Sequence, residues 1–364
     1  MNISSALRPP AEVTYYEELR LLGETDTHAR PPGWRLSPLA VKAFIIGDEQ
    51  RSIPRKFYGD DTLVERIIVG LASNRGLLLV GEPGTAKSML SELLTAAISG
   101  DSTNTIQGSA GVTEDQVKYS WNYALLLAEG PTLRALVPSA VYTGMRAAKL
   151  VRFEELTRCP PEIQDALISI LSEKMLIISE LSGGERVILA QPGFNIVATA
   201  NTRDRGVHEM SSALKRRFNF ETVQPIRDLA LEVTLVQREC ARLLQDACAP
   251  VEIDRQVIEL LVTAFHDLRE GVTAEGIQVE KASAVMSTAE AVSVAMSAGI
   301  DAHYFGKKIL TPECVCRHLS SAVTKDTPED SKKLKHYFDV VVGQRGRQRG
   351  GLWSDFAKAR KWLV

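Results

Sequence analysis

An apolar run that ends in a glycine-containing turn and then in Lys-Ser constrains the fold of this chain most strongly. Residues 77–80 (Leu-Leu-Leu-Val) have the composition of a buried strand, and apolar residues spaced as one helical face follow Ser88. In such a strand–turn–helix, glycines let backbone N–H groups turn toward an anion, and the helix N-terminus adds its dipole. Lys87 can then reach the β- and γ-phosphates of a nucleotide, and the Ser88 hydroxyl can coordinate Mg²⁺. The stretch predicts a phosphate-binding loop.

The predicted loop departs from the usual pattern at one position. Ala86 stands where the pattern G-x-x-x-x-G-K-S/T has its second glycine, and glycine turns before helices are common in proteins. The loop alone therefore does not establish a nucleotide site, and residues elsewhere have to support it. The residues expected to contact a nucleotide at this loop are Gly81, Glu82, Pro83, Gly84, Thr85, Ala86, Lys87, Ser88 and Met89.

Polar residues end two other predicted strands. Glu154 and Glu155 follow the strand at 149–153, and Asn201 follows the strand at 194–200. Because parallel strands place their carboxyl ends at one edge of a sheet, these residues are expected beside the loop. Glu154 would hold Mg²⁺, directly or through water, although Asp is usual there, and Glu155 would orient and deprotonate the attacking water. Asn201 would hydrogen-bond the γ-phosphate or that water; a solvated glutamate pair and a capping asparagine are the structural alternatives.

Strand and helix signals alternate up to residue 223, and only helical stripes follow Pro225. This order predicts an α/β fold, a parallel sheet with helices on both faces, followed by an all-helical part. Residues 108–148 are expected to form an irregular insert, and residues 175–190 a β-hairpin. The predicted domains are an N-terminal helical extension (1–56), a nucleotide-binding α/β domain (57–225), a helical lid (226–343) and a basic tail (344–364).

Composition excludes several other classes of protein. The formal net charge of −2 gives no general attraction to nucleic acid, and five scattered cysteines give no disulfide framework. The Cys314-x-Cys316-x-His318 sequence is expected to pack in a helix, because side chains two residues apart diverge there. No signal peptide and no apolar run of about 18 residues is present, so we expect a cytoplasmic protein without a membrane span.

Five motifs in this order resemble the MoxR group of AAA+ ATPases, within the dynein-related subfamily. They are GEPGTAKS, VRFEELTRCPPEIQDALISIL, the 175–190 hairpin, FNIVATANTRDRG and ALKRRF, within a match over about residues 57–300. The resemblance implies an AAA+ core with a lid, ATP and Mg²⁺ as cofactors, and a homo-oligomeric ring, usually a hexamer, with each nucleotide between two subunits. It implies that the 175–190 hairpin is the pre-sensor-1 insertion and that 108–148 is the helix-2 insert.

The resemblance also assigns roles to individual residues. Glu154 and Glu155 are the second-motif pair, and Asn201 is at the sensor-1 position. Arg217, directly before Phe218, matches the arginine finger that reaches a neighbouring subunit's nucleotide, with Arg216 as the adjacent alternative. Phe57 and Tyr58 are at the position of the family's adenine-side box. In the lid, the segment Met286-Ser287-Thr288-Ala289-Glu290 lacks the family's sensor-2 arginine, and Lys281 is the substitute.

Three functions are compatible with these residues. The first is an ATP-driven, chaperone-like protein for the remodelling or maturation of protein complexes or for metal-cofactor assembly, with a von Willebrand factor A-domain partner and an unidentified protein client. The second is a nucleic-acid motor, for which Trp353 and Phe356 in the basic tail would stack on bases; Glu180 and Glu185 at the hairpin tip disfavour it. The third is a nucleotide-binding scaffold with little turnover, because of Glu154 and the missing lid arginine.

Overall fold

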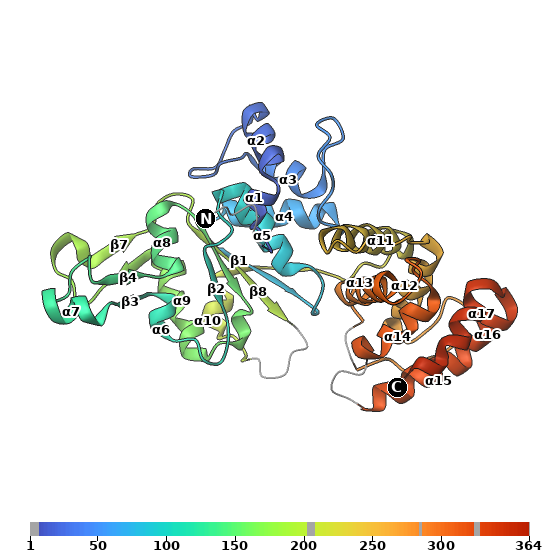
Figure 1. Cartoon of the computed structure of the whole chain (residues 1–364). Coiled ribbons are helices and arrows are strands. Elements are labelled where there is room, and N and C mark those ends of the chain that lie inside the picture. Colours follow the sequence, from blue (N-terminus) through green and yellow to red (C-terminus); the bar gives the residue numbers. More distant parts are fainter. Residues whose placement is uncertain (1–6, 202–207, 284–285, 324–327, 364) are drawn as a thin grey trace. The chain divides into compact units, whose positions relative to one another are not determined.

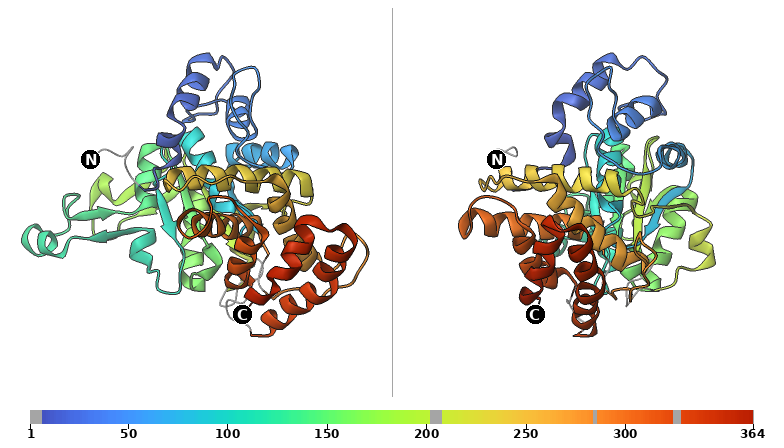
Figure 2. Two further views of the ribbon diagram at one scale, coloured as in Figure 1. Left: turned by 45° about the vertical axis from the view of Figure 1, so that its right-hand side comes forward. Right: turned by 90° about the vertical axis from the view of Figure 1, so that its right-hand side faces the viewer.

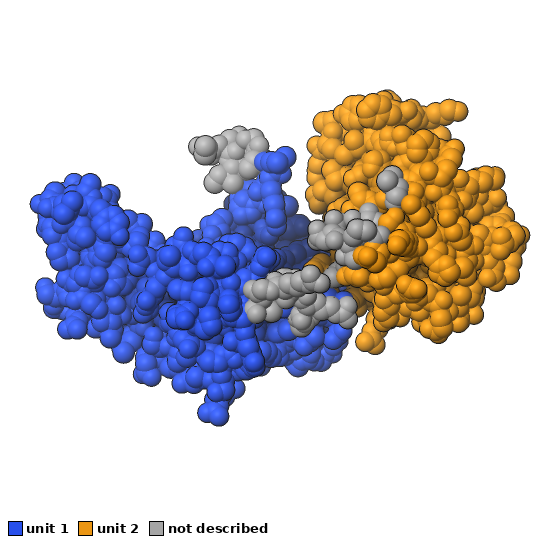
Figure 3. Space-filling view, turned by 90° about the horizontal axis from the view of Figure 1, so that it is seen from below, with its two compact units in different colours: residues 1–82, 86–224 blue, residues 83–85, 225–364 orange. Residues whose placement is uncertain are grey.

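The computed structural model describes residues 7–201, 208–283, 286–323 and 328–363. The chain divides into two compact units: residues 1–82 with 86–224, and residues 83–85 with 225–364 (Figure 3). Each unit has its own hydrophobic core, and each is described by itself below. Asn201, Lys281 and residues 286–290 are described, whereas the Thr202–Gly206 part of the FNIVATANTRDRG motif lies outside the described residues.

A five-stranded parallel sheet organises the first unit, in the strand order β2-β5-β8-β1-β9 (Figure 1). Its strands are β1 (Gly76–Gly81), β2 (Thr105–Gln107), β5 (Leu150–Glu154), β8 (Asn195–Asn201) and β9 (Phe218–Thr222). Successive residues of β1 face opposite sides: Leu77 and Leu79 join one core and Leu78 joins the other. An uninterrupted apolar strand is what a parallel sheet covered on both faces requires, so the predicted α/β fold is confirmed.

Helices cover both faces of this sheet. One face packs against N-terminal helices, whose buried residues include Phe44, Ile67 and Leu94, and the other packs against residues such as Leu167 and Ile170. The first set is α1 (Ala11–Thr14), α2 (Tyr16–Thr25), α3 (Pro38–Ile46), α4 (Asp61–Ala72) and α5 (Lys87–Ser99). The second set is η2 (Leu156–Arg158), α9 (Pro161–Glu173) and α10 (Ser212–Lys215).

Two antiparallel strand pairs extend from the first unit, away from the sheet (Figures 1 and 2). The predicted 175–190 hairpin is present as β6 (Met175–Ile177) and β7 (Val187–Leu189), with η3 (Gly183–Arg186) between them. The insert at 108–148 is more regular than predicted, with α6 (Glu114–Val117), β3 (Tyr119–Trp121), α7 (Tyr123–Glu129), β4 (Leu136–Pro138) and α8 (Ala140–Ala147). The prediction failed because Gly130 and Pro138 lie at the ends of short elements, where they interrupt nothing.

The second unit is helical, as predicted. Its elements are α11 (Leu229–Asp246), α12 (Arg255–Glu270), α13 (Thr288–Tyr304), α14 (Pro312–Val323), α15 (Pro328–Tyr337), η4 (Phe338–Val342), α16 (Gly343–Arg349), α17 (Gly351–Lys358) and η5 (Ala359–Trp362). Cys316 is buried in α14, in keeping with the packing role expected for this cysteine. Among the described residues, none of the helices combines the length and apolar character that crossing a membrane requires.

The segment 344–364 is not a separate basic tail in the structure. Phe356 is fully buried in the core of the second unit, so it is not available to stack on bases. Arg345 is also buried and donates to Asp267 and Glu275, and its guanidinium lies 4.8 Å from the ring centre of Trp353. The prediction failed because it weighed the basic residues of this segment above its apolar ones.

Candidate functional site

The predicted phosphate-binding loop joins β1 directly to α5. Gly84 has φ +76°, and Ala86, the N-cap of α5, has φ 64° and ψ 22°. The position where the usual pattern has its second glycine therefore needs the left-handed conformation, which costs a non-glycine residue about 1–2 kcal/mol. Ala86 keeps the loop conformation at that energetic cost.

Lys87 lies inside this loop. Its ammonium donates hydrogen bonds to the carbonyl oxygens of Gly81 (3.0 Å) and Glu82 (2.7 Å), and its side chain is buried. These contacts hold a cation where the predicted phosphates would bind. They agree with the role predicted for Lys87 without testing it.

Glu154, at the end of β5, accepts hydrogen bonds on both carboxylate oxygens. Oε2 accepts from Ser88 Oγ (2.7 Å) and Thr199 Oγ1 (2.8 Å), and Oε1 accepts from Ser91 Oγ (2.6 Å) and Arg152 Nη2 (2.9 Å). Burial raises the pKa of Glu154, but the bonds from Ser91, Ser88 and Thr199 and the charge of Arg152 outweigh it, so the pKa is lowered. The group is a fixed, buried carboxylate.

Arg152 is the residue at this site that the sequence analysis missed. Its side chain is 11% exposed, and besides Glu154 it bonds to the carbonyl oxygens of Ser102 (2.9 Å) and Ser88 (3.3 Å). The signal was present in the sequence, because residues two apart on a strand share a face and Arg152 stands two before Glu154. The carboxylate predicted to hold the metal thus has a neutralising cation beside it.

Magnesium prefers oxygen ligands, and Ser88 and Glu154 supply a hydroxyl and a carboxylate in direct contact. These residues fit the metal role predicted for them, and the Arg152 ion pair favours a contact through water over a direct one. Elsewhere in the part of the chain that the structure describes, no group of three or more His, Cys, Asp or Glu side chains is arranged to hold a metal.

Glu155 follows in a left-handed conformation, with φ 54° and ψ 44°. Its backbone N–H donates to Thr199 Oγ1 (2.9 Å), while its carboxylate accepts from Arg158 Nη1 (2.7 Å). Thr199 therefore links the two glutamates, a contact that the sequence analysis did not predict. To act on water, the Glu155 carboxylate has to leave Arg158.

Asn201 is the register partner of Gly81 across β8 and β1. The strand order places β8 between β5 and β1. The carboxyl-terminal ends of these three parallel strands therefore form one edge, which we call the carboxyl edge. The structure brings Glu154, Asn201 and the start of the loop together there, as expected from the topology. Their individual roles remain predictions.

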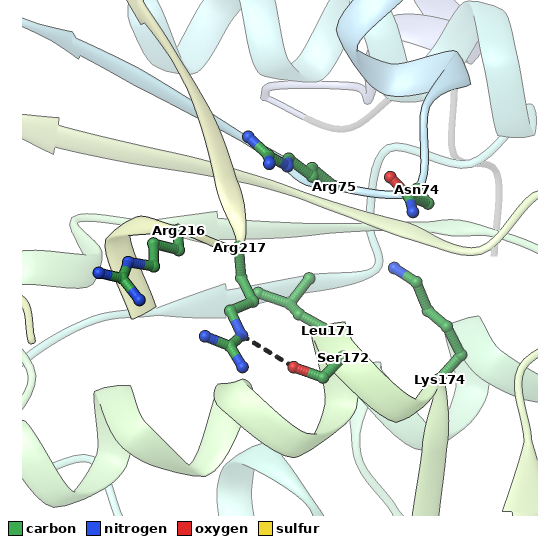
Figure 4. Close-up of a pocket in the computed structure, with 7 residues that line it drawn as sticks. All are labelled: Asn74, Arg75, Leu171, Ser172, Lys174, Arg216 and Arg217. Carbon is green, nitrogen blue, oxygen red and sulfur yellow. Dashed lines mark hydrogen bonds between the residues drawn. The ribbon is translucent and has the colours of Figure 1, made fainter. Parts of the chain in front are cut away.

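The predicted arginine finger lies at the opposite edge of the sheet, which we call the amino edge. Gly76, the first residue of β1, donates its N–H to the carbonyl oxygen of Arg217 (2.9 Å). Arg217 Nε donates to Ser172 Oγ (2.8 Å) (Figure 4). Its Nη1 donates to the Ala213 carbonyl oxygen (2.9 Å). Arg216 is exposed, and its side chain makes no hydrogen bond or ion pair with described residues. The structure does not bring either arginine to the carboxyl edge.

The predicted adenine-side residues differ from each other. Phe57 is buried in the core of the first unit, so its side chain is not presented to a ligand. Tyr58 is half-buried, with the Arg55 guanidinium 5.9 Å from its ring centre. Only Tyr58 has a side chain partly open to solvent.

In the second unit, a buried carboxylate ties three helices together near the segment that lacks the sensor-2 arginine. Glu232 of α11 accepts from His266 Nε2, Arg269 Nη2 (3.1 Å) and Thr288 Oγ1 (2.6 Å). Arg269 Nη1 also donates to the Met286 carbonyl oxygen (2.9 Å). Lys281, the predicted substitute, is exposed. Arg269 was not predicted, and its charge is already paired with Glu232.

Comparisons with known proteins agree with this architecture. Residues 76–218 match the AAA domain of the dynein-related subfamily, and residues 230–364 match the YehL-like AAA+ ATPase C-terminal domain. The uncharacterized protein YehL of Escherichia coli (strain K12) is 49% identical over 356 residues, which are 98% of this chain and 97% of that protein.

More distant relatives match over less of their length. Chaperone MoxR1 of Mycobacterium tuberculosis (strain ATCC 25618 / H37Rv) is 28% identical over 195 residues, covering 53% of this chain and 48% of that protein. A crystal structure of NtrX from Brucella abortus aligns with a TM-score of 0.50 and 10% identity, over 84% of this chain and 69% of that one. The NtrX likeness concerns the fold alone.

Proposed function

Because this chain belongs to the YehL family of dynein-related AAA+ ATPases, we propose that it hydrolyses ATP at the carboxyl edge, in a ring whose neighbouring subunit completes the site. The family assignment supports ATP binding by the AAA domain. The observation that supports the ring is the separation of the two edges. From Gly76 to Gly81, β1 makes five steps of about 3.3 Å, so roughly 16 Å separates the finger from its own loop.

Each residue at the carboxyl edge has a proposed task. Lys87 and the N–H groups at the start of α5 bind the phosphates, and Ser88 with Glu154 holds Mg²⁺, which neutralises phosphate charge when bound. Arg152 keeps the Glu154 carboxylate ionised and in place. Glu155 turns from Arg158 to the attacking water and accepts its proton, while Asn201 orients that water or the γ-phosphate.

The arginine pair completes the site from the neighbouring subunit. An arginine inserted beside the γ-phosphate stabilises the charge that develops during phosphoryl transfer. Arg216 has a guanidinium without a partner among the described residues, whereas Arg217 is fixed to Ser172 and Ala213. We propose that Arg217 fixes the position of the arginine pair and that either arginine contacts the phosphate. The proposal that the ring is a hexamer rests on the family resemblance.

We propose that the energy is used to remodel or mature protein complexes, with a von Willebrand factor A-domain partner. Two projecting elements expose apolar side chains: Leu127 is 90% and Tyr123 is 70% exposed on α7, and Leu189 is 63% exposed on β7. Such side chains suit a protein client better than nucleic acid, which requires basic surface. The name of the relative MoxR1, a chaperone, supports the same proposal.

A nucleotide-binding scaffold with little turnover is the second candidate. The Glu155–Arg158 contact favours it, because the Glu155 carboxylate has to break this contact before it can act on water.

ATP turnover separates the two candidates. We expect Glu155→Gln to lower turnover by about 10²-fold or more while ATP binding persists. The control is Glu162→Gln, at an exposed residue in the first turn of α9, with turnover unchanged. Wild-type protein that binds ATP and shows no turnover above the Glu155→Gln level would establish the scaffold instead.

A further inference from the structure

A pocket of about 300 Å³ lies at the amino edge, away from the carboxyl edge. Three elements enclose it: the turn before β1, the end of α9, and the segment between α10 and β9 (Figure 4). We call it the amino-edge pocket; its lining residues are Asn74, Arg75, Leu171, Ser172, Lys174, Arg216 and Arg217. Four of these side chains are cations and none is acidic, so the pocket has a strongly positive lining.

Two of the cations are arginines whose guanidinium groups are unpaired among the described residues. Within the described residues, the side chains of Arg75 and Arg216 make no hydrogen bond or ion pair, and both are exposed. Arg217 is held by Ser172 Oγ and the Ala213 carbonyl oxygen, which are neutral groups. Positive charge in the pocket is therefore not neutralised by the lining itself.

Lys174 is the least satisfied of the four. Its Nζ is inaccessible to solvent and has no hydrogen-bond partner within the described part of the chain, and the nearest aromatic ring centre, of Phe194, is 5.9 Å away. Burial lowers the pKa of Lys174, as expected for an ammonium without a counter-charge. Figure 4 shows the amine pointing toward Asn74, in the turn before β1.

The backbone at Lys174 is also unfavourable for a lysine. The residue ends α9 with φ 50° and ψ 36°, a left-handed conformation that glycine or asparagine adopts at lower cost. A buried, unpaired amine on a left-handed residue is disfavoured twice on structural grounds. Such a residue points to a ligand that stabilises it.

We propose that the amino-edge pocket binds a phosphoryl group, with Lys174 as a second phosphate-binding cation beside the arginine pair. A phosphoryl group carries about two negative charges and three acceptor oxygens, so it can accept from the lysine and from several guanidinium groups at once. A single carboxylate neutralises only one of the four cations. Two sources are open, a nucleotide held by the neighbouring subunit and a free phosphate ion; only the first rests on the proposed function.

Binding of inorganic pyrophosphate to a Lys87→Ala chain tests the pocket. The substitution disables the loop at the carboxyl edge, so remaining affinity reports the amino-edge pocket. We expect Lys87→Ala/Lys174→Met to bind pyrophosphate at least about tenfold more weakly than Lys87→Ala in calorimetry, the effect of losing one charged hydrogen bond. The matched control is Lys215→Met in the same background, because Lys215 is exposed and paired with Glu209 outside the pocket.

Thermal unfolding without pyrophosphate shows whether Lys174 has a structural role instead. Removing a buried, unpaired amine should leave the melting temperature unchanged or raise it by about 2 °C. A lower melting temperature together with unchanged pyrophosphate affinity would overturn the proposal. If Lys174→Met fails to fold, Arg75→Gln replaces it, and unchanged affinity in that variant has the same meaning.

ATP turnover of Lys174→Met in the otherwise intact chain separates the two sources. Weaker pyrophosphate binding with lost turnover assigns the phosphoryl group to the neighbour's nucleotide, and weaker binding with wild-type turnover assigns it to a free phosphate ion. A wild-type chain without turnover contradicts the proposed function, but the pyrophosphate comparison still decides the pocket.

Discussion

The two edges of the sheet treat their buried charges in opposite ways. At the carboxyl edge, the buried Glu154 and the half-buried Arg152 neutralise each other, and three hydroxyl groups complete the carboxylate's hydrogen bonds. At the amino edge, the Lys174 amine is buried with no hydrogen-bond partner among the described residues, and the Arg216 side chain has no described partner either. The first arrangement is complete within one chain, whereas the described residues supply no anion to the second. The comparison supports our proposal that the amino edge is half of a site.

The largest effect is expected from removing the Arg152–Glu154 ion pair at the carboxyl edge. Arg152→Met leaves the Glu154 carboxylate buried without a cation, so the free energy of unfolding should fall by about 3–5 kcal/mol. Urea unfolding at pH 7 measures it. The same exchange at Lys174 removes no ion pair and should not destabilise the chain, so equal destabilisation by both substitutions would remove the distinction between the edges.

Acid should reduce the stability that the carboxyl edge contributes, but not that of the amino edge. The pKa of Glu154 is lowered below its ordinary value of 4.5, because its hydrogen bonds and Arg152 outweigh burial. Its contribution to stability is then fully present above about pH 4.5 and is lost as the pH falls through the folded-state pKa. At pH 7 we expect the free energy of unfolding of the wild-type chain to exceed that of Glu154→Gln by about 2 kcal/mol. Urea unfolding from pH 7 to pH 3 should show that this difference is constant at first and then shrinks. A difference that grows in acid would contradict the lowered pKa of Glu154.

The smallest effect is expected at the loop itself. Ala86→Gly relieves the left-handed strain but adds freedom to the unfolded chain, so the net gain should be about 0.5–1 kcal/mol. Thermal unfolding measures it, with Ala97→Gly in the interior of α5 as the control that should destabilise. A loss of stability in Ala86→Gly would mean that Ala86 makes a packing contribution larger than its strain.

The sequence predicted the carboxyl edge well because its information is local. Strand ends follow from apolar runs, and parallel topology brings Glu154 and Asn201 beside the loop without any knowledge of packing. Arg152 was missed because the strand was interpreted by its apolar residues, although its spacing from Glu154 was visible.

The amino edge and the C-terminal segment depend on tertiary structure. The burial of the Lys174 amine and its left-handed backbone are set by α9, β1 and the segment after α10 together, so no spacing in the sequence reveals them. Arg345 was counted as part of a basic tail, but its partners Asp267 and Glu275 are 78 and 70 residues away in the chain. Charge composition does not show which cations are paired.

Subunit mixing tests the central claim, that one chain's amino edge completes its neighbour's carboxyl edge. Glu155→Gln and the double variant Arg216→Ala/Arg217→Ala should each lose ATP turnover when alone. In an equal random mixture, an intact interface needs the arginine-deficient chain on one side and the Glu155→Gln chain on the other, so one half times one half, about one quarter, of wild-type turnover should return. Turnover that stays absent in mixtures shown to co-assemble, or an arginine double variant that is fully active alone, would contradict the claim.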